Sequence, residues 1–318
     1  MQKRESAKRL ALTLFALLIS IAAFGAQFAS AANVGNTVTF VQISDDHFNP
    51  GSNRENCRMG KYSTDMLEDA VDQINNMQGI DFVMFTGDMI DGPSADLLAK
   101  FAAIANRLNV PWYWTTGNHD ISPSGMHRET LLEKMRKLNR YTNVGNTYYS
   151  FKKNGMLFIA LDGAYDDRVT SRGFFSDANL RFLDSRLKEN SGMPAMIFHH
   201  FPIVYPISST SHEVANKADY LKIIDSNPNV KAVFSGHYHI AKITKRNNVA
   251  HVSSPSLIQY PNSFRVVTLT SGAAGFTLDI RMVGTRLREA QEKSRTTCPG
   301  ASMSAGKDID RNIHITLK

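Results

Sequence analysis

Short apolar segments alternate with amphipathic segments along most of this chain. Residues 82–85 (FVMF) form an unbroken apolar run, which is typical of a strand buried on both faces. Residues 64–77 instead repeat their apolar side chains at helical spacing, with Met66, Ala70 and Ile74 on one stripe. Because the strands and helices predicted in this way follow one another in turn, the pattern indicates an α/β fold whose parallel strands are joined by crossover helices.

The same criteria predict the remaining elements. Strands are expected at residues 38–43, 82–85, 110–115, 147–151, 156–161, 195–198, 230–234, 264–269 and 276–282. Helices are expected at residues 64–77, 97–108, 129–138, 177–187 and 215–224. The strands at 147–151 and 156–161 are separated by a short polar connection, so we expect them to form a hairpin. Beyond residue 283 the chain becomes polar and basic, and we therefore expect one domain at 32–283 followed by a loose tail at 284–318.

The beginning of the chain has the three parts of a secretory signal peptide. A basic head that includes Lys3 and Arg4 precedes an uncharged apolar run at residues 10–26, and Ala29-Ser30-Ala31 supplies a small-x-small cleavage site. An uncleaved membrane anchor is the alternative, although the run is short for a membrane span. We expect residues 1–31 to be removed from an exported protein, periplasmic or secreted. No second apolar run has spanning length, so we expect no other membrane segment.

Charge and cysteine content narrow the possible partners. The net charge of +7 favours an anionic ligand without requiring one. No block of lysines and arginines is long enough to indicate a nucleic-acid surface, so we expect no nucleic-acid partner. The two cysteines of the chain, Cys57 and Cys298, either pair as a disulfide, as exported proteins allow, or remain two buried free thiols. The sequence assigns no oligomeric state.

Five of the predicted strands run directly into Asp, Asn or His side chains. These residues are Asp45, His47, Asp88, Asn118, His119, His200, His237 and His239. In a wound α/β sheet the carboxyl ends of the strands meet at one edge, so we expect these side chains to gather there. Mixed oxygen and nitrogen ligands suit Mn²⁺, iron or Zn²⁺ better than Mg²⁺ or Ca²⁺, and the lack of cysteine among them argues against a structural zinc of the finger type. The set is too large for one ion and indicates two.

These residues fall in motifs that resemble those of the calcineurin-like metallophosphoesterases. In chain order the motifs are D-x-H at 45–47, G-D-x-x-D at 87–91, G-N-H-D at 117–120, H-x-P at 200–202 and G-H-x-H at 236–239. Purple acid phosphatases have Gly where this chain has His47, so the chain is more similar to class III cyclic nucleotide phosphodiesterases and glycerophosphodiester-type enzymes. The resemblance implies a four-layer α/β/β/α sandwich in which two mixed sheets are flanked by helices.

The resemblance also implies a role for each residue of the motifs. Seven residues would hold two metal ions: Asp45, His47 and His239 the first, Asn118, His200 and His237 the second, and Asp88 both. His119 would face the phosphate as an acid or charge stabiliser, and Asp91 would orient it. The implied reaction is hydrolysis of a small-molecule phosphoester, either diester or monoester, by attack of metal-bound hydroxide.

Three neighbouring residues have less specific interpretations. Asp46 points away from Asp45 and His47 on an extended chain, so we expect it on the surface or in a supporting contact. His199 is expected either to support the site or to face the substrate. His212 lies in a loop that could wall the pocket, but a surface or packing position is the simpler interpretation.

The motifs specify the metal chemistry and leave the organic group of the substrate open. A nucleotide pyrophosphatase or nucleotidase would use the same ligands. A nuclease and a non-catalytic metal- or nucleotide-binding protein are further alternatives. The loops expected to select the substrate are residues 49–61, 122–127, 162–173 and 201–213.

Overall fold

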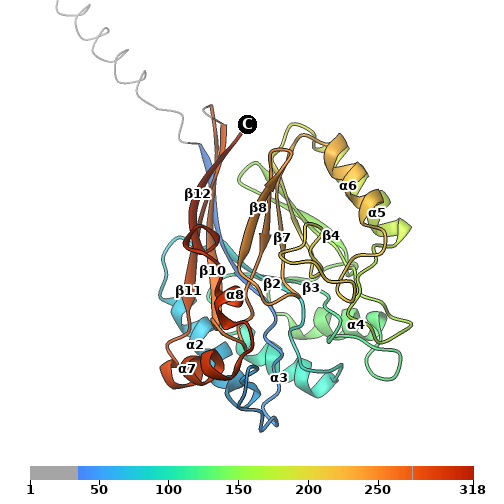
Figure 1. The fold of residues 1–318 in the computed structure, drawn as a ribbon. Coiled ribbons are helices and arrows are strands. Elements are labelled where there is room, and N and C mark those ends of the chain that lie inside the picture. The colour runs from blue at the N-terminus through green and yellow to red at the C-terminus, as the bar shows by residue number, and fades with distance from the viewer. Residues whose placement is uncertain (1–34, 274) are drawn as a thin grey trace, which may run out of the picture. The chain divides into compact units, whose positions relative to one another are not determined.

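The computed structural model of the protein describes residues 35–273 and 275–318, and the signal peptide expected at residues 1–31 lies outside them. Residues 36–271 and 275–318 belong to one unit, which contains both β-sheets described here (Figure 1). Among the described residues, no helix is both long and apolar enough to cross a bilayer.

In the described part of the chain, twelve strands form two sheets of six. The first sheet contains, in spatial order, β12 (Asn312–Leu317), β11 (Gly275–Gly284), β10 (Ser263–Gly272), β1 (Asn36–Ile43), β2 (Phe82–Thr86) and β3 (Trp112–Thr115). The second contains β4 (Tyr149–Lys153), β5 (Met156–Ala160), β6 (Ala195–Phe198), β7 (Val230–Ser235), β9 (Val249–Ser253) and β8 (Lys242–Arg246). In each sheet a parallel core is joined by antiparallel outer strands, as in the β1–β2 and β1–β10 pairs, so both sheets are mixed.

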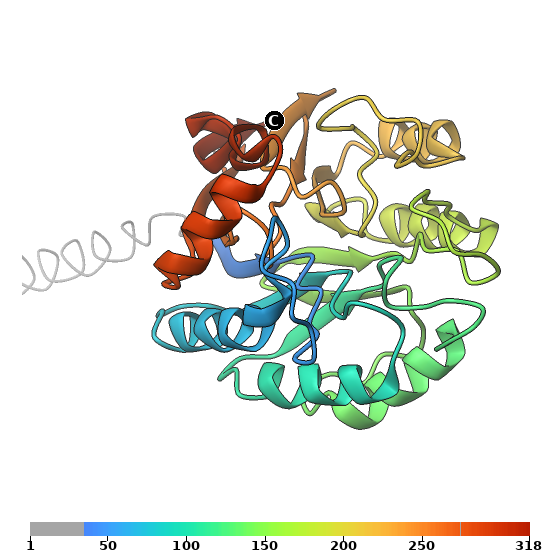
Figure 2. The ribbon, with the colours of Figure 1, turned by 60° about the horizontal axis from the view of Figure 1, so that its bottom comes forward.

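Crossover helices cover the outer face of each sheet. The helices that connect strands of the first sheet or follow it are α2 (Ser63–Asn75), α3 (Ala95–Ala105) and α4 (Arg128–Leu138). Those of the second sheet are α5 (Asp177–Glu189) and α6 (Lys217–Ser226), which lie side by side. Figure 2 shows α2, α3 and α4, coloured blue to green, along one side of the strands. The expected four-layer arrangement of two mixed sheets flanked by helices is confirmed.

The two sheets are held together by an aromatic core between them. Alternate residues of β1 point to opposite faces, so Val38 and Phe40 belong to this inner core while Val41 and Ile43 pack under the helices. The ring of Phe40 lies 5.1 Å from that of Phe82 in its own sheet and 5.1 Å from that of Phe234 in the other. Contacts of this kind fix the position of one sheet on the other.

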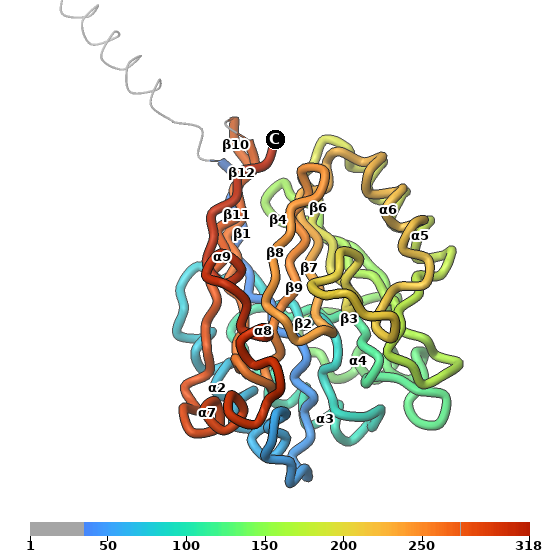
Figure 3. The backbone as a smooth tube through the Cα atoms, in the orientation of Figure 1, coloured from blue at the N-terminus to red at the C-terminus, as the bar shows by residue number. Residues whose placement is uncertain are grey.

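The expectation of a loose tail at residues 284–318 is wrong. This segment forms α7 (Arg288–Thr297), α8 (Ala301–Ala305), α9 (Asp308–Arg311) and β12, and β12 pairs with β11 along the edge of the first sheet (Figure 3). A disulfide joins Cys298 to Cys57. The prediction relied on the mostly polar composition of the segment and overlooked an alternation of polar and apolar residues near its end. Three of the apolar residues, Ile313, Ile315 and Leu317, contribute to the core between the sheets. The domain therefore extends beyond residue 283 to Leu317.

The buried end of β12 yields a stability prediction. Leu317 is fully buried, whereas Ile309 in α9 is 61% exposed. We expect Leu317→Ala to lower the free energy of unfolding by about 2–5 kcal/mol, because it removes buried methyl groups and leaves a cavity. Ile309→Ala is the control and should change it little. Urea unfolding measures both variants, and equal midpoints would mean that β12 contributes nothing to the core.

Candidate metal centre

The candidate ligands lie where strands of both sheets end. The expectation that all five strand ends belong to one sheet edge is wrong, because β1, β2 and β3 are in the first sheet and β6 and β7 in the second. Hydrogen bonds join the two edges. The Nε2 group of Gln42 in β1 donates to the carbonyl of Ser235 at 3.1 Å, and Nδ1 of His200 donates to the carbonyl of Thr86 at 2.8 Å. Stacking the sheets face to face therefore assembles the site.

Left-handed backbone turns the ligands inward immediately after the strands. Five of the candidate ligands have positive φ: Asp45 at 55°, His47 at 40°, Asp88 at 51°, His237 at 69° and His239 at 55°. Such a conformation costs on the order of 1–3 kcal/mol for a residue other than glycine, and it clusters at functional sites because the surroundings hold it there. The folded chain thus accepts local strain to present these side chains.

Two glycines of the motifs allow side chains of the site to pack closely against the backbone. Gly87 has a φ of +86°, and a Cβ atom there would lie 2.6 Å from Nδ1 of His200. A Cβ atom at Gly236 would lie 1.9 Å from Oγ of Ser44 and 2.4 Å from Oδ2 of Asp45. The motifs therefore need glycine at both positions because ligand side chains occupy the space.

The first group of ligand atoms comes from Asp45, His47 and His239, and these atoms all lie within 4.8 Å of one another. Nε2 of His239 is 3.2 Å from Nε2 of His47 and 3.2 Å from Oδ1 of Asp45. Nδ1 of His239 donates to Oε1 of Gln259 at 3.0 Å. This bond leaves the lone pair of Nε2 directed at the other two ligands, as in metal-binding histidines.

The second group contains Asp88, His200 and His237. Nε2 of His237 donates to the carbonyl of Ser171 at 2.7 Å, which leaves its Nδ1 facing Nε2 of His200 at 3.2 Å. The Oδ1 atom of Asn118 is buried and has no hydrogen-bond partner among the described residues. A buried amide oxygen without a partner is uncommon in a folded protein, and this one suits a role as a cation ligand.

One carboxylate oxygen faces both groups. Oδ2 of Asp88 lies 3.6 Å from Nε2 of His47 and 3.3 Å from Nε2 of His200. Because this atom of the second group also lies beside His47 of the first, any cations that the two groups hold would be neighbours.

The shifted pKa values of Asp45 and His47 favour cation binding, whereas that of His200 opposes it. Burial alone would raise the pKa of Asp45, but His239 and His200 outweigh it and hold the pKa below its usual value. Burial lowers the pKa of His47 to about 4, so this ring is neutral near pH 7. Burial would also lower the pKa of His200, yet Asp88 and Asp45 raise it to about 9. A cation must therefore compete with a proton for Nε2 of His200. The carboxylates, imidazoles and amide oxygen suit Mn²⁺, iron or Zn²⁺.

His119 differs from the ligands in being accessible. Its side chain is 31% exposed, whereas that of His47 is 1% exposed. Its backbone N–H donates to Oδ1 of Asp88 at 2.8 Å, and its Nδ1 lies 3.5 Å from Oδ1 of Asp91. Burial would lower the pKa of His119, but Asp88 and Asp91 together raise it. Asp91 also lies 3.6 Å from Nδ1 of His47, a contact that the sequence did not indicate.

Asp120 is a buried supporting residue that sequence reasoning left without a role. Its carboxylate accepts backbone N–H groups from Gly117 at 2.8 Å, Asp88 at 3.0 Å and Ile90 at 3.2 Å. It therefore ties the loop after β2 to the loop after β3. Its place in the G-N-H-D motif was the only signal in the sequence.

The structure also places the residues with less specific interpretations. Asp46 is only 3% exposed, so a surface position is wrong, and its carboxylate oxygens have no partner in the described chain. Burial raises its pKa well above the usual value. His199 is fully buried and bonded to the hydroxyl of Tyr220 at 3.0 Å, so it does not face a substrate. The ring of His212 packs 5.0 Å from that of His237.

A pocket of about 550 Å³ opens beside His119. Besides His119 and Asn118, it is lined by residues that include Ser122, Ser124, Val169 and Thr170. Two of the loops expected to select the substrate, residues 122–127 and 162–173, thus meet at the accessible histidine.

Known proteins share this sequence pattern and this fold. A sequence model of the calcineurin-like phosphoesterase family matches residues 38–241. The chain is similar to a 3′,5′-cyclic-nucleotide phosphodiesterase of Nostoc sp., at 28% identity over 205 residues, 63% of this chain and 71% of the relative. It is also similar to a 3′,5′-cyclic adenosine monophosphate phosphodiesterase of Pseudomonas aeruginosa, at 26% identity over 81% of this chain and 88% of the relative. A dimetal phosphatase from Danio rerio has the same fold, with a TM-score of 0.66, 19% identity, and coverage of 88% of this chain and 99% of its own.

The crowding at Gly236 can be tested without any assay of function. We expect Gly236→Ala to lower the free energy of unfolding by about 1–3 kcal/mol, because its methyl group would displace Ser44 and Asp45. Gly145→Ala is the matched control, since a Cβ atom there meets nothing within 4 Å. Chemical denaturation compares the two, and a Gly236→Ala protein as stable as the control would contradict the packing described here.

Proposed function

The chain belongs to the calcineurin-like phosphoesterase family, and from this we propose that it is an exported enzyme that hydrolyses small-molecule phosphodiesters with two metal ions. The observation that carries the proposal is the position of Asp88, whose Oδ2 atom faces both groups of ligand atoms. The names of the similar proteins from Nostoc and Pseudomonas aeruginosa favour a phosphodiester, and 3′,5′-cyclic nucleotides are the first natural compounds to test.

Seven residues would hold the two ions: Asp45, His47 and His239 one of them, Asn118, His200 and His237 the other, and Asp88 both. When bound, such ions supply Lewis acidity to the phosphoryl oxygens and lower the pKa of the attacking water. The hydrogen bonds from His200 to Thr86, from His237 to Ser171 and from His239 to Gln259 hold each ring in the orientation that this requires.

His119 would protonate the oxygen of the leaving group. It is the accessible histidine at the pocket, and the carboxylates of Asp88 and Asp91 favour its protonated form. Asp91 would orient the ring through Nδ1, which leaves Nε2 for the substrate. The pocket beside it would accept the organic arm next to the hydroxyl groups of Ser122, Ser124 and Thr170.

A phosphomonoester is the second candidate substrate. The observation that favours it is Arg58, a cationic residue whose backbone is bridged to Gln259, the partner of His239. Export, in turn, is supported by the sequence of residues 1–31 and by the disulfide between Cys57 and Cys298, because disulfides persist in oxidising compartments.

The proposed function makes a prediction about turnover. Protein stripped of metal and reloaded with Mn²⁺ should hydrolyse bis(4-nitrophenyl) phosphate. His119→Ala should keep its metal content and lose about 10²–10⁴-fold in kcat, because it removes the acid. Asp88→Asn should lose both bound metal and activity while remaining folded. Metal analysis and steady-state kinetics measure these effects, and an Asp88→Asn variant with full metal content and full turnover would refute the assignment.

The proposed function also makes a prediction about the pH dependence of activity. If His119 acts as an acid, activity falls as pH rises through its pKa. Asp91→Asn removes a carboxylate that raises this pKa, so the basic limb of the kcat/KM profile should move to lower pH. Asp166→Asn is the control, because Asp166 lies 3.5 Å from the exposed His127 and should leave the limb in place. An unmoved limb in Asp91→Asn would show that Asp91 does not act on the acid.

A further inference from the structure

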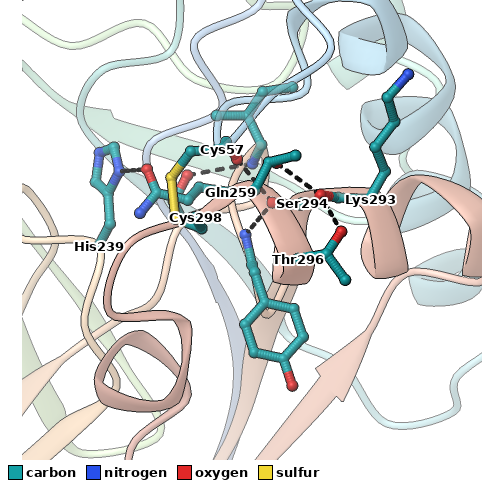
Figure 4. The surroundings of a disulfide bond; sticks show 11 residues. Cys57, His239, Gln259, Lys293, Ser294, Thr296 and Cys298 are labelled. Atoms are coloured by element: carbon teal, nitrogen blue, oxygen red, sulfur yellow. Dashed lines mark hydrogen bonds between the residues drawn. A yellow bond between two sulfur atoms is a disulfide. The ribbon is translucent and has the colours of Figure 1, made fainter.

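The backbone around Arg58 is fixed on both sides, although it lies in the long loop between β1 and α2. Arg58 forms an isolated antiparallel bridge with Gln259, and the N–H of Met59 donates to the carbonyl of Ile258 at 2.9 Å. The preceding residue, Cys57, is bonded to Cys298 and accepts a hydrogen bond from Oγ of Ser294 at 2.7 Å (Figure 4). The loop therefore presents Arg58 from a defined position.

This position adjoins the metal centre. Gln259 is the bridge partner of Arg58, and its side chain accepts a hydrogen bond from Nδ1 of His239. Figure 4 shows Gln259 and His239 beside the disulfide. His239 belongs to the same ligand group as His47, whose ring meets that of His119 edge to face, with centroids 4.5 Å apart. The backbone bridge to Gln259 thus places Arg58 on the side of the site that holds His239.

The guanidinium of Arg58 has no anionic partner within the described chain. Its neighbour in the loop, Lys61, pairs with Glu55 at 2.6 Å, and Lys293 of α7 pairs with the same carboxylate at 2.7 Å. Arg58 instead lines a surface depression together with Arg54, Gln259 and Thr297, and it is partly buried there. A partly buried guanidinium beside a phosphoester site is a ready partner for a phosphate oxygen, because its planar fork matches that geometry.

We propose that Arg58 binds a charged oxygen of the substrate that neither the metal ions nor His119 would contact. This contact lets the site bind phosphomonoesters. The inference rests on the proposed function. A diester has two non-bridging oxygens that share one negative charge, whereas a monoester has three and carries nearly two charges near neutral pH. The contact therefore strengthens monoester binding more than diester binding. Because hydrolysis of a diester produces a monoester, Arg58 also retains the product.

The test compares two substrates and two arginines. In Arg58→Ala we expect KM for 4-nitrophenyl phosphate to rise on the order of tenfold to a hundredfold, with little change in kcat, because a charged hydrogen bond common to bound substrate and transition state is lost. KM for bis(4-nitrophenyl) phosphate should change little. Arg58→Lys should recover part of the loss, since it keeps the charge and lacks the fork. Arg54→Ala is the control, because Arg54 lines the same depression and is more exposed.

Three outcomes would overturn the inference: equal losses on both substrates, an equal effect of Arg54→Ala, or reduced metal content in Arg58→Ala. If the wild-type protein hydrolyses neither ester, the proposed function fails, and Arg58 is then judged by calorimetric titration of inorganic phosphate into the Mn²⁺-loaded protein. Weaker phosphate binding in Arg58→Ala than in Arg54→Ala supports the contact. Equal binding in the two variants excludes it.

Discussion

The structure depends on the stabilisation of two buried carboxylates, Asp45 and Asp88. Both are almost completely removed from water, and both remain ionised because imidazole rings and backbone N–H groups surround them. A buried charge without such partners would strongly oppose folding. The histidines at the ends of β6 and β7 supply part of this compensation, so the two sheets need each other at this edge. Two metal ions held by these residues would add to this compensation.

The apolar interior makes that meeting of sheets possible. Phe40 packs against aromatic rings of both sheets, and the core between them extends to Leu317 near the end of the chain. A rigid core of this kind can hold residues in left-handed conformations that the loops would not adopt by themselves. The strained backbone at the site therefore depends on the dense packing of the core behind it.

Exposure divides the site into two functions. His47 and His200 are buried and would hold metal, which requires a fixed geometry and little contact with solvent. His119 and Arg58 are partly exposed and would contact the substrate. The buried set would therefore specify the metal chemistry, and the accessible residues would select the substrate.

Local patterns in the sequence determined most of the elements and all of the candidate ligands, because apolar periodicity and motifs such as G-N-H-D involve residues close together in the chain. They failed where the relevant contact is distant. His47 and His239 are 192 residues apart, and the membership of β1 and β7 in different sheets follows from strand pairing that no local pattern encodes. The burial of Asp46, the ordering of residues 284–318 and the fixed position of Arg58 likewise depend on contacts between separated segments. Only the tertiary structure decided these, because burial and pairing are properties of the packed chain.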